Sequence, residues 1–360
     1  MNRVRVGVSV TVLLLAPLAG RALTVLQRVE PKPLSWRIER LFPASSETVR
    51  VVVTRDERLV PWLLASHAGK SGPYNLYQGF YNENARAVAD LFEAGGREAV
   101  EVLGMKAGDG GATLEITIKD FRIQLAPPQF GLPNYITYGD VRTALKSADG
   151  TELGAGSFRV ANWETSRAPA QDVVSAAYLR AAWEATVRTL LDHFPKKPEP
   201  EAIARLLASL ETTRDEYRRV YPIFWLGLVA RDEPAVVEKL YTLFRANEDQ
   251  TTYEAAAVAL ARLSAPGARE EFEAMLAGSK KWKEWDPRGD AEEAFVLLHS
   301  LALLGVTDLG ARVPPTLQRH REKLPDLVRF HSTGEIPKPT PKELEELTEK
   351  YQKYEAKRKR

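Results

Sequence analysis

The first half of the chain alternates apolar and polar positions as β-strands do, and the second half repeats its apolar positions at helical spacing. The run VRVVVT (Val49–Thr54) is nearly continuous and β-branched, which predicts a strand buried on both faces. EAVEVLG (Glu98–Gly104) predicts a second, short strand. Three more strands are predicted for TLEITIKDFRI, YITYGDVRTALKS and LGAGSFRVANWE. The alternation in the first of these changes phase, which predicts a β-bulge near Lys119 or Asp120.

Helices are predicted before, within and after this group of strands. A short proline-bounded helix is expected around Ser35–Phe42, and NENARAVADLFEAGG predicts a helix that stops at Gly95-Gly96. A long helix is predicted from Gln171 to Phe194, and Asp149-Gly150 predicts a two-residue hairpin turn. The order β-α-β-β-β-β-α, with the helices on one face, predicts a two-layer α/β sandwich with a mixed sheet, and the whole chain is of the α+β class.

The region 201–330 contains apolar stripes at helical spacing and no strand pattern. A constant offset of about thirty residues relates Leu240, Leu243 and Phe244 to Phe272, Met275 and Leu276. Each group follows a helix end and a short break that contains proline. Residues 201–324 therefore resemble HEAT-like helical repeats, with Leu317–Leu324 as the second helix of a third pair; an irregular helical bundle is the alternative.

Composition shifts divide the chain into six segments. KKPEP (Lys196–Pro200) is a proline-rich hinge, and a highly charged stretch ends the sequence. The predicted segments are a signal peptide (1–22), a linker (23–47), the α/β sandwich domain (48–195), the hinge (196–200), the all-α helical repeat domain (201–330) and a charged tail (331–360).

The N-terminal segment has the three zones of a secretory signal. Arg3 and Arg5 precede an apolar run from Val6 to Leu18, and Gly20 and Ala22 provide small residues for cleavage. The run is shorter than the about 20 apolar residues that a spanning helix needs. We expect a periplasmic or otherwise exported protein; the alternative is a membrane anchor formed by an uncleaved N-terminal segment, the one case in which membrane association is expected.

The absence of cysteine narrows the chemistry. With Cys 0, the chain has no lipid-attachment residue, no disulfide and no thiolate for catalysis or metal binding. The near balance of Lys+Arg 50 and Asp+Glu 48 gives no large field of one sign, so nucleic acid is not expected as a partner.

Residues 49–194 resemble the small α/β domain of bacterial cell-envelope proteins. The similarity lies in LFEAGG followed by VEVLG, in LEITIKDFRI, in the hairpin at ADGTELGAG and in the helix AAYLRAAWEATVRTLLDHF. The domains it resembles are the TolB N-terminal domain and the lipoproteins that activate penicillin-binding proteins or assist transporters. The resemblance implies a docking or assembly role in the envelope and carries no catalytic residues.

Familiar catalytic motifs are missing from the sequence. HxxxH, HExxH, GxSxG and a P-loop are absent, and GDGGAT is followed by a predicted strand and not by a helix N-terminus. His299, among leucines, is expected to be a core or groove residue. A carboxylate–histidine site at Asp56, Glu57 and His67 is the weaker alternative. We therefore name no catalytic, cofactor-binding or metal-ligating residue, and expect no cofactor.

Aromatic clusters give the stronger functional signal, because exposed aromatics favour interfaces. Two clusters contain the six residues named below, and PPQFGLPNYITYG is a third. The alternative for all three clusters is that their rings pack against their own domain. The residues predicted to bind a partner are Tyr74, Tyr77, Phe80, Tyr81, Trp282 and Trp285.

Two functions follow from these patterns. The first is a non-enzymatic exported adaptor or scaffold of the cell envelope, which binds protein partners through aromatic loops and a helical-repeat surface. The alternative is an enzyme or small-ligand-binding protein with its site in the cleft between the domains. A cleft with convergent histidine, carboxylate and arginine side chains would favour the alternative.

Overall fold

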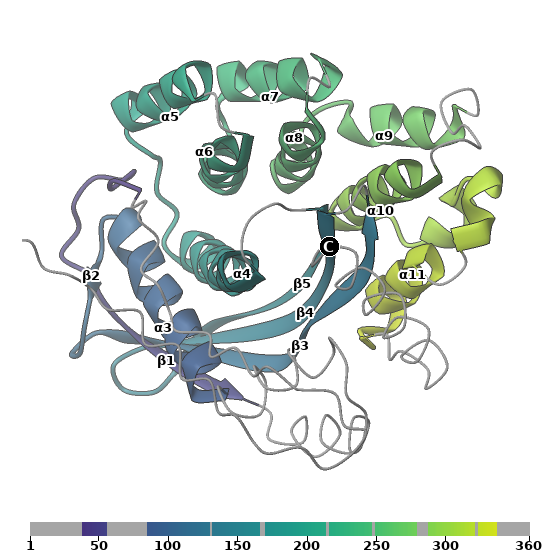
Figure 1. Cartoon of the computed structure of the whole chain (residues 1–360). Helices are drawn as coiled ribbons and strands as arrows, with labels where there is room; N and C mark the ends of the chain where they lie inside the picture. Colours follow the sequence, from purple (N-terminus) through teal and green to yellow (C-terminus); the bar gives the residue numbers. More distant parts are fainter. Residues whose placement is uncertain are drawn as a thin grey trace, which may run out of the picture.

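The protein has an α+β architecture, as the sequence predicts: a mixed five-stranded sheet is followed by a layer of helices (Figure 1). The sheet order is β2-β1-β3-β4-β5; β1 runs parallel to β2 and β3, and the remaining pairs are antiparallel. The computed structural model describes residues 38–55, 85–129, 132–165, 170–213, 216–246, 249–278, 287–320 and 323–336.

The strands follow the predicted pattern closely. The register of β3 shifts between Ile118 and Asp120, so Ile118 and Phe121 are both buried, as the predicted bulge requires. Gly150 has φ 88° in the β4–β5 hairpin, but residues 147–151 form the connection, which is longer than the two residues expected. The strands are β1 (Thr48–Arg55), β2 (Lys106–Ala107), β3 (Ala112–Gln129), β4 (Leu132–Lys146) and β5 (Glu152–Thr165).

Two helices, α3 (Ala85–Val102) and α4 (Ala170–His193), pack on the sheet. The predicted stop at Gly95-Gly96 and the predicted strand Glu98–Gly104 are wrong, because α3 continues through both glycines. A Cβ on Gly95 would lie 3.0 Å from Ala182 Cβ, and one on Gly96 would lie 2.8 Å from Val51 Cγ1. The glycines therefore allow close packing of α3 against α4 and β1, and the second strand forms later, as β2.

The expected helix around Ser35–Phe42 is absent from its described part, residues 38–42. This segment runs beside the end of α3: the Leu41 amide donates to the Val102 carbonyl (2.9 Å), and the Ser45 amide donates to the Gly104 carbonyl (2.7 Å). These bonds satisfy carbonyl groups at the end of α3, and they hold the buried side chains of Leu41 and Phe42 in the core.

The C-terminal half of the described chain forms two rows of helices (Figure 1). An outer row holds α5, α7 and α9, and an inner row holds α6, α8 and α10 nearer the sheet. Across the rows, α5 contacts α6, α7 contacts α8, and α9 contacts α10, as in stacked helix pairs; the HEAT-like assignment stays a prediction. The helices are α5 (Pro200–Thr212), α6 (Glu216–Val229), α7 (Pro234–Ala246), α8 (Gln250–Arg262), α9 (Ala268–Ala277) and α10 (Pro287–Leu303).

The chain after α10 differs from the prediction. The expected helix Leu317–Leu324 is replaced by a 3₁₀ helix, Pro315–His320, and a separate helix α11 (Lys323–Thr333). The Leu317 amide bonds the Pro314 carbonyl three residues back, because proline at 314 and 315 opens a tight turn in place of an α-helix. Another 3₁₀ helix, Leu309–Arg312, precedes it.

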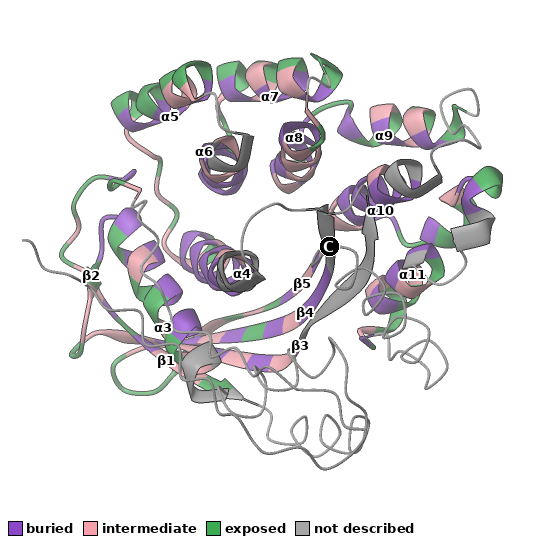
Figure 2. Cartoon of the chain, in the orientation of Figure 1, coloured by how far each residue is buried: buried purple, intermediate pink, exposed green. Residues whose placement is uncertain are grey.

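Aromatic rings join the sheet to the helical rows. Tyr138 of β4 lies 5.2 Å from Phe330 of α11 and 6.0 Å from Phe295 of α10, measured between ring centroids. On α4, Trp183 lies 5.5 Å from Trp225 of α6. Burial is concentrated on the facing sides of α4, α6, α8 and α10, whereas the outer row exposes its outward faces (Figure 2).

The segment between α4 and α5 is fixed to the start of the described chain. Lys196 Nζ lies 2.9 Å from Glu47 Oε2, and the Glu199 amide donates to the Leu41 carbonyl (2.8 Å). The division into two domains at this segment stays a prediction.

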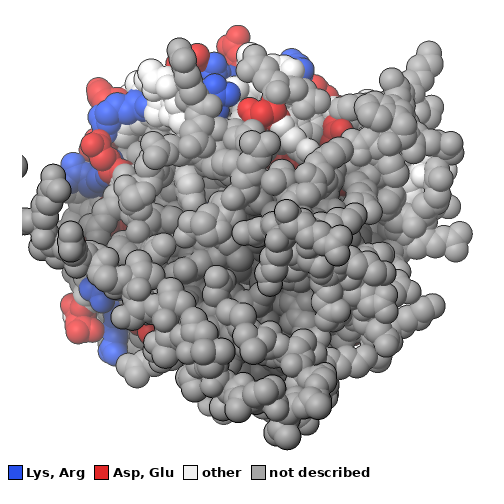
Figure 3. All heavy atoms as spheres, viewed as in Figure 1, with Lys and Arg blue, Asp and Glu red and all other residues white. Residues whose placement is uncertain are grey.

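Charged side chains of both signs cover the outer helices. Where described residues are visible in Figure 3, Lys and Arg lie among Asp and Glu along the upper and left edges. Arg245 of α7 and Glu271 of α9 form one such pair, with Nη2 and Oε2 2.7 Å apart. Within the described ranges, no helix has the length and hydrophobicity that a membrane span requires.

The contact between α6 and α8 depends on Gly227, because a Cβ there would lie 2.7 Å from both Cα and Cβ of Ala259. Gly227→Ala should lower the free energy of unfolding by about 1–3 kcal/mol through overpacking, despite the about 1 kcal/mol gain in helix propensity. Urea denaturation measures this change. Gly154→Ala is the control, because a Cβ there meets nothing within 4 Å. Equal stability of the two variants would contradict the close packing.

Candidate functional site

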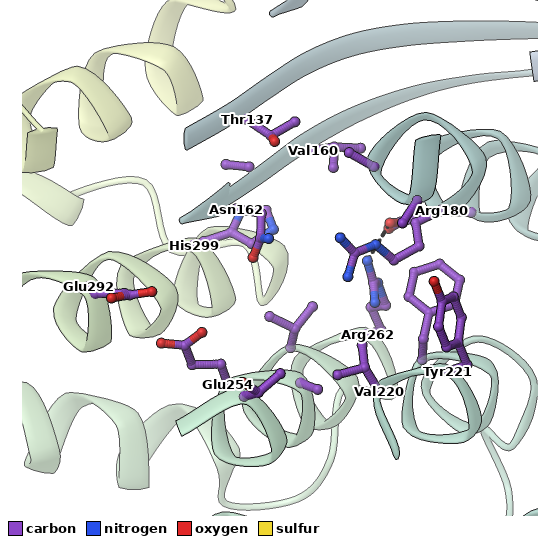
Figure 4. A pocket seen from close by; sticks show the side chains of 18 of the residues that line it. Thr137, Val160, Asn162, Arg180, Val220, Tyr221, Glu254, Arg262, Glu292 and His299 are labelled. Atoms are coloured by element: carbon purple, nitrogen blue, oxygen red, sulfur yellow. Dashed lines mark hydrogen bonds and ion pairs between the residues drawn. The ribbon is translucent and has the colours of Figure 1, made fainter. Parts of the chain in front are cut away.

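A cavity of about 190 Å³ lies where the sheet meets the helices. Its walls come from β4, β5, α4, α6, α8 and α10, so both halves of the described chain contribute (Figure 4). Val160, Val220, Phe224 and Val258 form apolar wall, and the polar lining includes Arg180, Glu184, Glu254, Arg262, Glu292 and His299.

Helical periodicity places these polar side chains. On α4, Arg180 and Glu184 are four residues apart and therefore share a face. On α8, Glu254, Val258 and Arg262 follow at successive intervals of four, so one face of the helix presents an acid, an apolar residue and a base to the cavity.

The cavity wall contains a buried ion pair. Arg262 Nη2 of α8 lies 2.5 Å from Glu184 Oε2 of α4, and the two side chains are 9% and 4% exposed. Arg188 Nη1 approaches the other oxygen of Glu184 at 3.4 Å. The Arg262 guanidinium also lies over the Phe224 ring, 4.6 Å from its centroid. These contacts fix the guanidinium in position, and Arg262 Nε has no hydrogen-bond partner among the described residues.

A pair of histidines lies behind the lining. His299 of α10 lines the cavity, and its Nδ1 is 3.0 Å from Nε2 of His331 on α11. Burial lowers the pKa of His299 to about 3, with a smaller contribution from Arg262. Burial also lowers the pKa of His331 to about 2, helped by His299 and Arg159. Both rings are therefore neutral at neutral pH, and one donates a hydrogen bond to the other.

The charged groups of the lining come from several helices, and Glu184 lies beside Arg262. Glu254 and Glu292 extend from α8 and α10 at one end of the cavity, and Arg180 and Arg262 lie at the other end (Figure 4). Glu292 is only 2% exposed, and Glu254 Oε1 accepts a hydrogen bond from Gln250 Nε2 (3.0 Å). The cavity therefore has one end with two carboxylates and another end with two arginines and the carboxylate of Glu184; Asn162 and His299 lie between them in Figure 4.

The described residues contain no group of three or more histidine, aspartate or glutamate side chains that could hold a metal ion. The lining groups can instead hold a ligand by hydrogen bonds and charge. The apolar wall can bury the ligand's nonpolar part.

The aromatic residues that the sequence singles out are not part of this cavity. Tyr138, from the third aromatic cluster, is a core residue and packs on Phe295 and Phe330. The carboxylate–histidine alternative at Asp56, Glu57 and His67 lies outside the described residues, as do the six predicted partner-binding residues, Tyr74, Tyr77, Phe80, Tyr81, Trp282 and Trp285.

Sequence reasoning missed the pairs that build the cavity. Arg262 lies in the region 201–330, for which apolar helical stripes are predicted, and Glu184 lies in the alanine-rich helix α4. A charged residue on a predicted core face could have indicated these pairs, because a buried charge needs a buried partner. His299 was expected in a core or groove, and it is buried and lines the cavity.

The histidine pair should make the protein acid-sensitive. Each folded-state pKa lies below the ordinary value of about 6.5, so the unfolded chain binds more protons as the pH falls below 6.5. The free energy of unfolding should be level above about pH 7.5, should begin to fall near pH 6.5 and should approach a slope of about 1.4 kcal/mol per pH unit for each histidine near pH 5.5. Chemical denaturation at pH 7.5, 6.5 and 5.5 measures this slope.

The control is the double variant His299→Gln with His331→Gln, which keeps hydrogen-bonding side chains but removes both titrating groups. Its unfolding free energy should change much less over the same pH range. Equal slopes for the variant and the natural chain would show that the pair does not cause the acid sensitivity.

Comparison with known proteins defines no family for this chain. The sequence matches no family model and no curated protein. Among solved structures, a Xanthomonas campestris protein of the family DUF330 aligns with a TM-score of 0.27 and 15% identity, over 42% of this chain and 90% of that one. A minor lipoprotein from Acinetobacter baumannii aligns with a TM-score of 0.25 and 9% identity, over 44% of this chain and 100% of that one. TM-scores of this size do not establish a shared fold, and the cell-envelope assignment stays a prediction.

Proposed function

We propose that the protein binds a small polar ligand in the cavity between the sheet and the helices. The observation that carries this proposal is the convergence of charged side chains from α4, α8 and α10 on one cavity. Convergent polar groups in a pocket at the junction of two parts of a fold are the usual form of a ligand site.

The cost of burying charge supports the same conclusion. Arg262, Glu184 and Glu292 are all at least nine-tenths buried. Taking ionised groups out of water costs several kcal/mol per ion, and apolar side chains of similar volume often stabilise a core equally well or better. Ligand recognition is therefore supported as a role for the charged lining in addition to the structural ion pair of Arg262 and Glu184.

The dimensions of the cavity limit the ligand. About 190 Å³ lies below the roughly 300–1,000 Å³ of sites for drug-sized molecules. Val160, Val220 and Phe224 can cover the nonpolar part of a small molecule, and the charged ends can fix its orientation. The ligand is thus of metabolite size, with both polar and apolar surface.

Filling the cavity should abolish binding. Val258 lies on the cavity face of α8, so Val258→Phe should occupy the ligand's space and reduce ligand retention at least tenfold. Native mass spectrometry after incubation with a small-molecule extract measures retention, and calorimetry then measures affinity. Ligand at about 100 times its dissociation constant should stabilise the natural chain by about 2.7 kcal/mol.

Thr242→Phe is the matched control, because Thr242 is exposed on α7, outside the cavity lining. The control should retain ligand as the natural chain does. Failure of the natural chain to retain any small molecule, or equal retention by Val258→Phe, would contradict the proposal.

A second candidate is the exported cell-envelope adaptor or scaffold that the sequence predicts, with protein partners bound by aromatic loops and a helical-repeat surface. Its support is the pair Trp282 and Trp285 in the segment that joins α9 to α10, together with the exposed outer faces of α5, α7 and α9 (Figure 2). Large aromatics on an insertion between helical pairs are suited to anchor a partner.

Trp285→Ala tests the adaptor candidate. If Trp285 is an anchor, the variant should recover less partner than the natural chain in crosslinking pull-downs from an envelope fraction. Its free energy of unfolding should stay within about 1 kcal/mol of that of the natural chain. Glu284→Ala, in the same segment, is the control and should recover partner normally. A loss of about 3–5 kcal/mol would instead place Trp285 in a core.

A further inference from the structure

The charged side chains of the cavity lining already have partners within the chain. Arg262 pairs with Glu184, and Glu254 accepts a hydrogen bond from a side chain of its own helix. Arg180 and Glu292 also have interaction partners. A charged ligand would have to displace one of these contacts or bring an uncompensated charge into a place of low dielectric, and both are unfavourable. The lining therefore favours a ligand without charge.

Three uncharged polar side chains also line the cavity. Thr137 of β4 and Asn162 of β5 are paired directly across the two strands, so their side chains lie on the same face of the sheet. His299 comes from α10, which packs on β5. Its ring is neutral at neutral pH, because burial lowers its pKa to about 3. We call Thr137, Asn162 and His299 the neutral cluster.

Two members of the neutral cluster keep a hydrogen-bonding atom for a ligand. Nδ1 of His299 bonds His331, so Nε2, on the other side of the ring, is the nitrogen left for the cavity. The Thr137 hydroxyl has no hydrogen-bond partner among the described residues, although Thr137 is only 4% exposed. Asn162 differs from these two, because it already has a partner. Buried polar atoms of this kind need a partner, and a ligand in the cavity can supply it.

The two atoms define the kind of group that they can bind. A hydroxyl donates and accepts, and a neutral imidazole nitrogen does either, according to which ring nitrogen carries the proton. The bond between His299 and His331 permits both arrangements, because each ring can be the donor. An uncharged group that itself donates and accepts, a hydroxyl or a carboxamide, therefore matches both atoms.

We propose that the cavity binds a small uncharged molecule whose hydroxyl or carboxamide group bonds Thr137 and His299, and whose apolar part lies against Val160, Val220 and Phe224. The charged groups at the two ends of the cavity stay paired within the chain and contact such a ligand through hydrogen bonds alone. The assignment rests on the proposed function and narrows it to one ligand class.

Four probes with the same branched body test the charge of the ligand. 4-Methylpentanamide and 4-methylpentan-1-ol are uncharged at neutral pH, 4-methylpentanoate is an anion, and 4-methylpentan-1-amine is a cation. Titration of the purified full chain, followed by nuclear magnetic resonance, should give an affinity for the amide or the alcohol at least tenfold higher than for either ion. Equal or tighter binding of an ion, or no binding of the amide and the alcohol, overturns the assignment.

Thr137→Val tests the polar contact on the sheet, because valine has the shape of threonine without the hydroxyl. The variant should bind the preferred uncharged probe about fivefold more weakly, as expected for the loss of one neutral hydrogen bond. Thr113→Val is the matched control, because Thr113 lies on β3, outside the lining, and it should bind as the natural chain does. Unchanged binding by Thr137→Val, or an equal loss in the control, overturns the role of Thr137.

His299 is tested by spectroscopy, because a substitution there also disturbs His331. In the isotope-labelled natural chain, the preferred uncharged probe should shift the nitrogen resonance of His299 Nε2, and the signal missing from His299→Gln identifies it. His193, at the end of α4 and outside the lining, should not shift and serves as the internal control. A saturated chain with no change at His299 overturns its role.

The outcomes separate this inference from the broader proposed function. If an extract yields a retained molecule that is charged and Val258→Phe abolishes its retention, the cavity is a ligand site and the uncharged assignment is wrong. If no extract molecule and no probe is retained, both are wrong.

Discussion

The buried pair of Arg262 and Glu184 is the interaction on which the rest of the site depends. It connects α8 of the helical rows to α4 of the α/β layer, and removing one partner of such a pair costs about 3–5 kcal/mol because a charge is left buried alone. The pair also fixes the separation of α4 and α8, between which the cavity lies. Because a charge pair tolerates less displacement than an apolar contact, it sets the geometry of the cavity wall as well as its chemistry.

Much of the fold could be predicted from periodicity alone. The strands β1, β3, β4 and β5 and the helices from α4 to α10 have strong local patterns, and the bulge in β3 follows from a change of phase at Asp120. The errors have tertiary causes. Gly95 and Gly96 look like a helix stop, yet they serve close packing against α4 and β1, which lie elsewhere in the sequence. Local propensity cannot distinguish these two roles of glycine.

The site could be predicted much less well than the fold. Its defining contacts join positions 78 residues apart in the case of Glu184 and Arg262, and 32 apart in the case of His299 and His331. No spacing rule connects such positions, because their proximity results from how the helical rows pack on the sheet. The sequence does contain one signal: Arg262, Glu184 and His299 are polar residues on helix faces that are otherwise apolar.

The packing of Tyr138 against Phe330 has a consequence for how the protein is made. About 190 residues separate the two rings in the sequence. Trp163 of β5 likewise packs against Phe295 of α10, which comes much later in the chain. During synthesis, all strands of the sheet are therefore made long before the helices that cover its aromatic face. Contacts of such long range slow folding, and an exposed aromatic face in the interval favours aggregation. Burial of the aromatic face of the sheet therefore depends on the last helices of the described chain, which are synthesised after all of its strands.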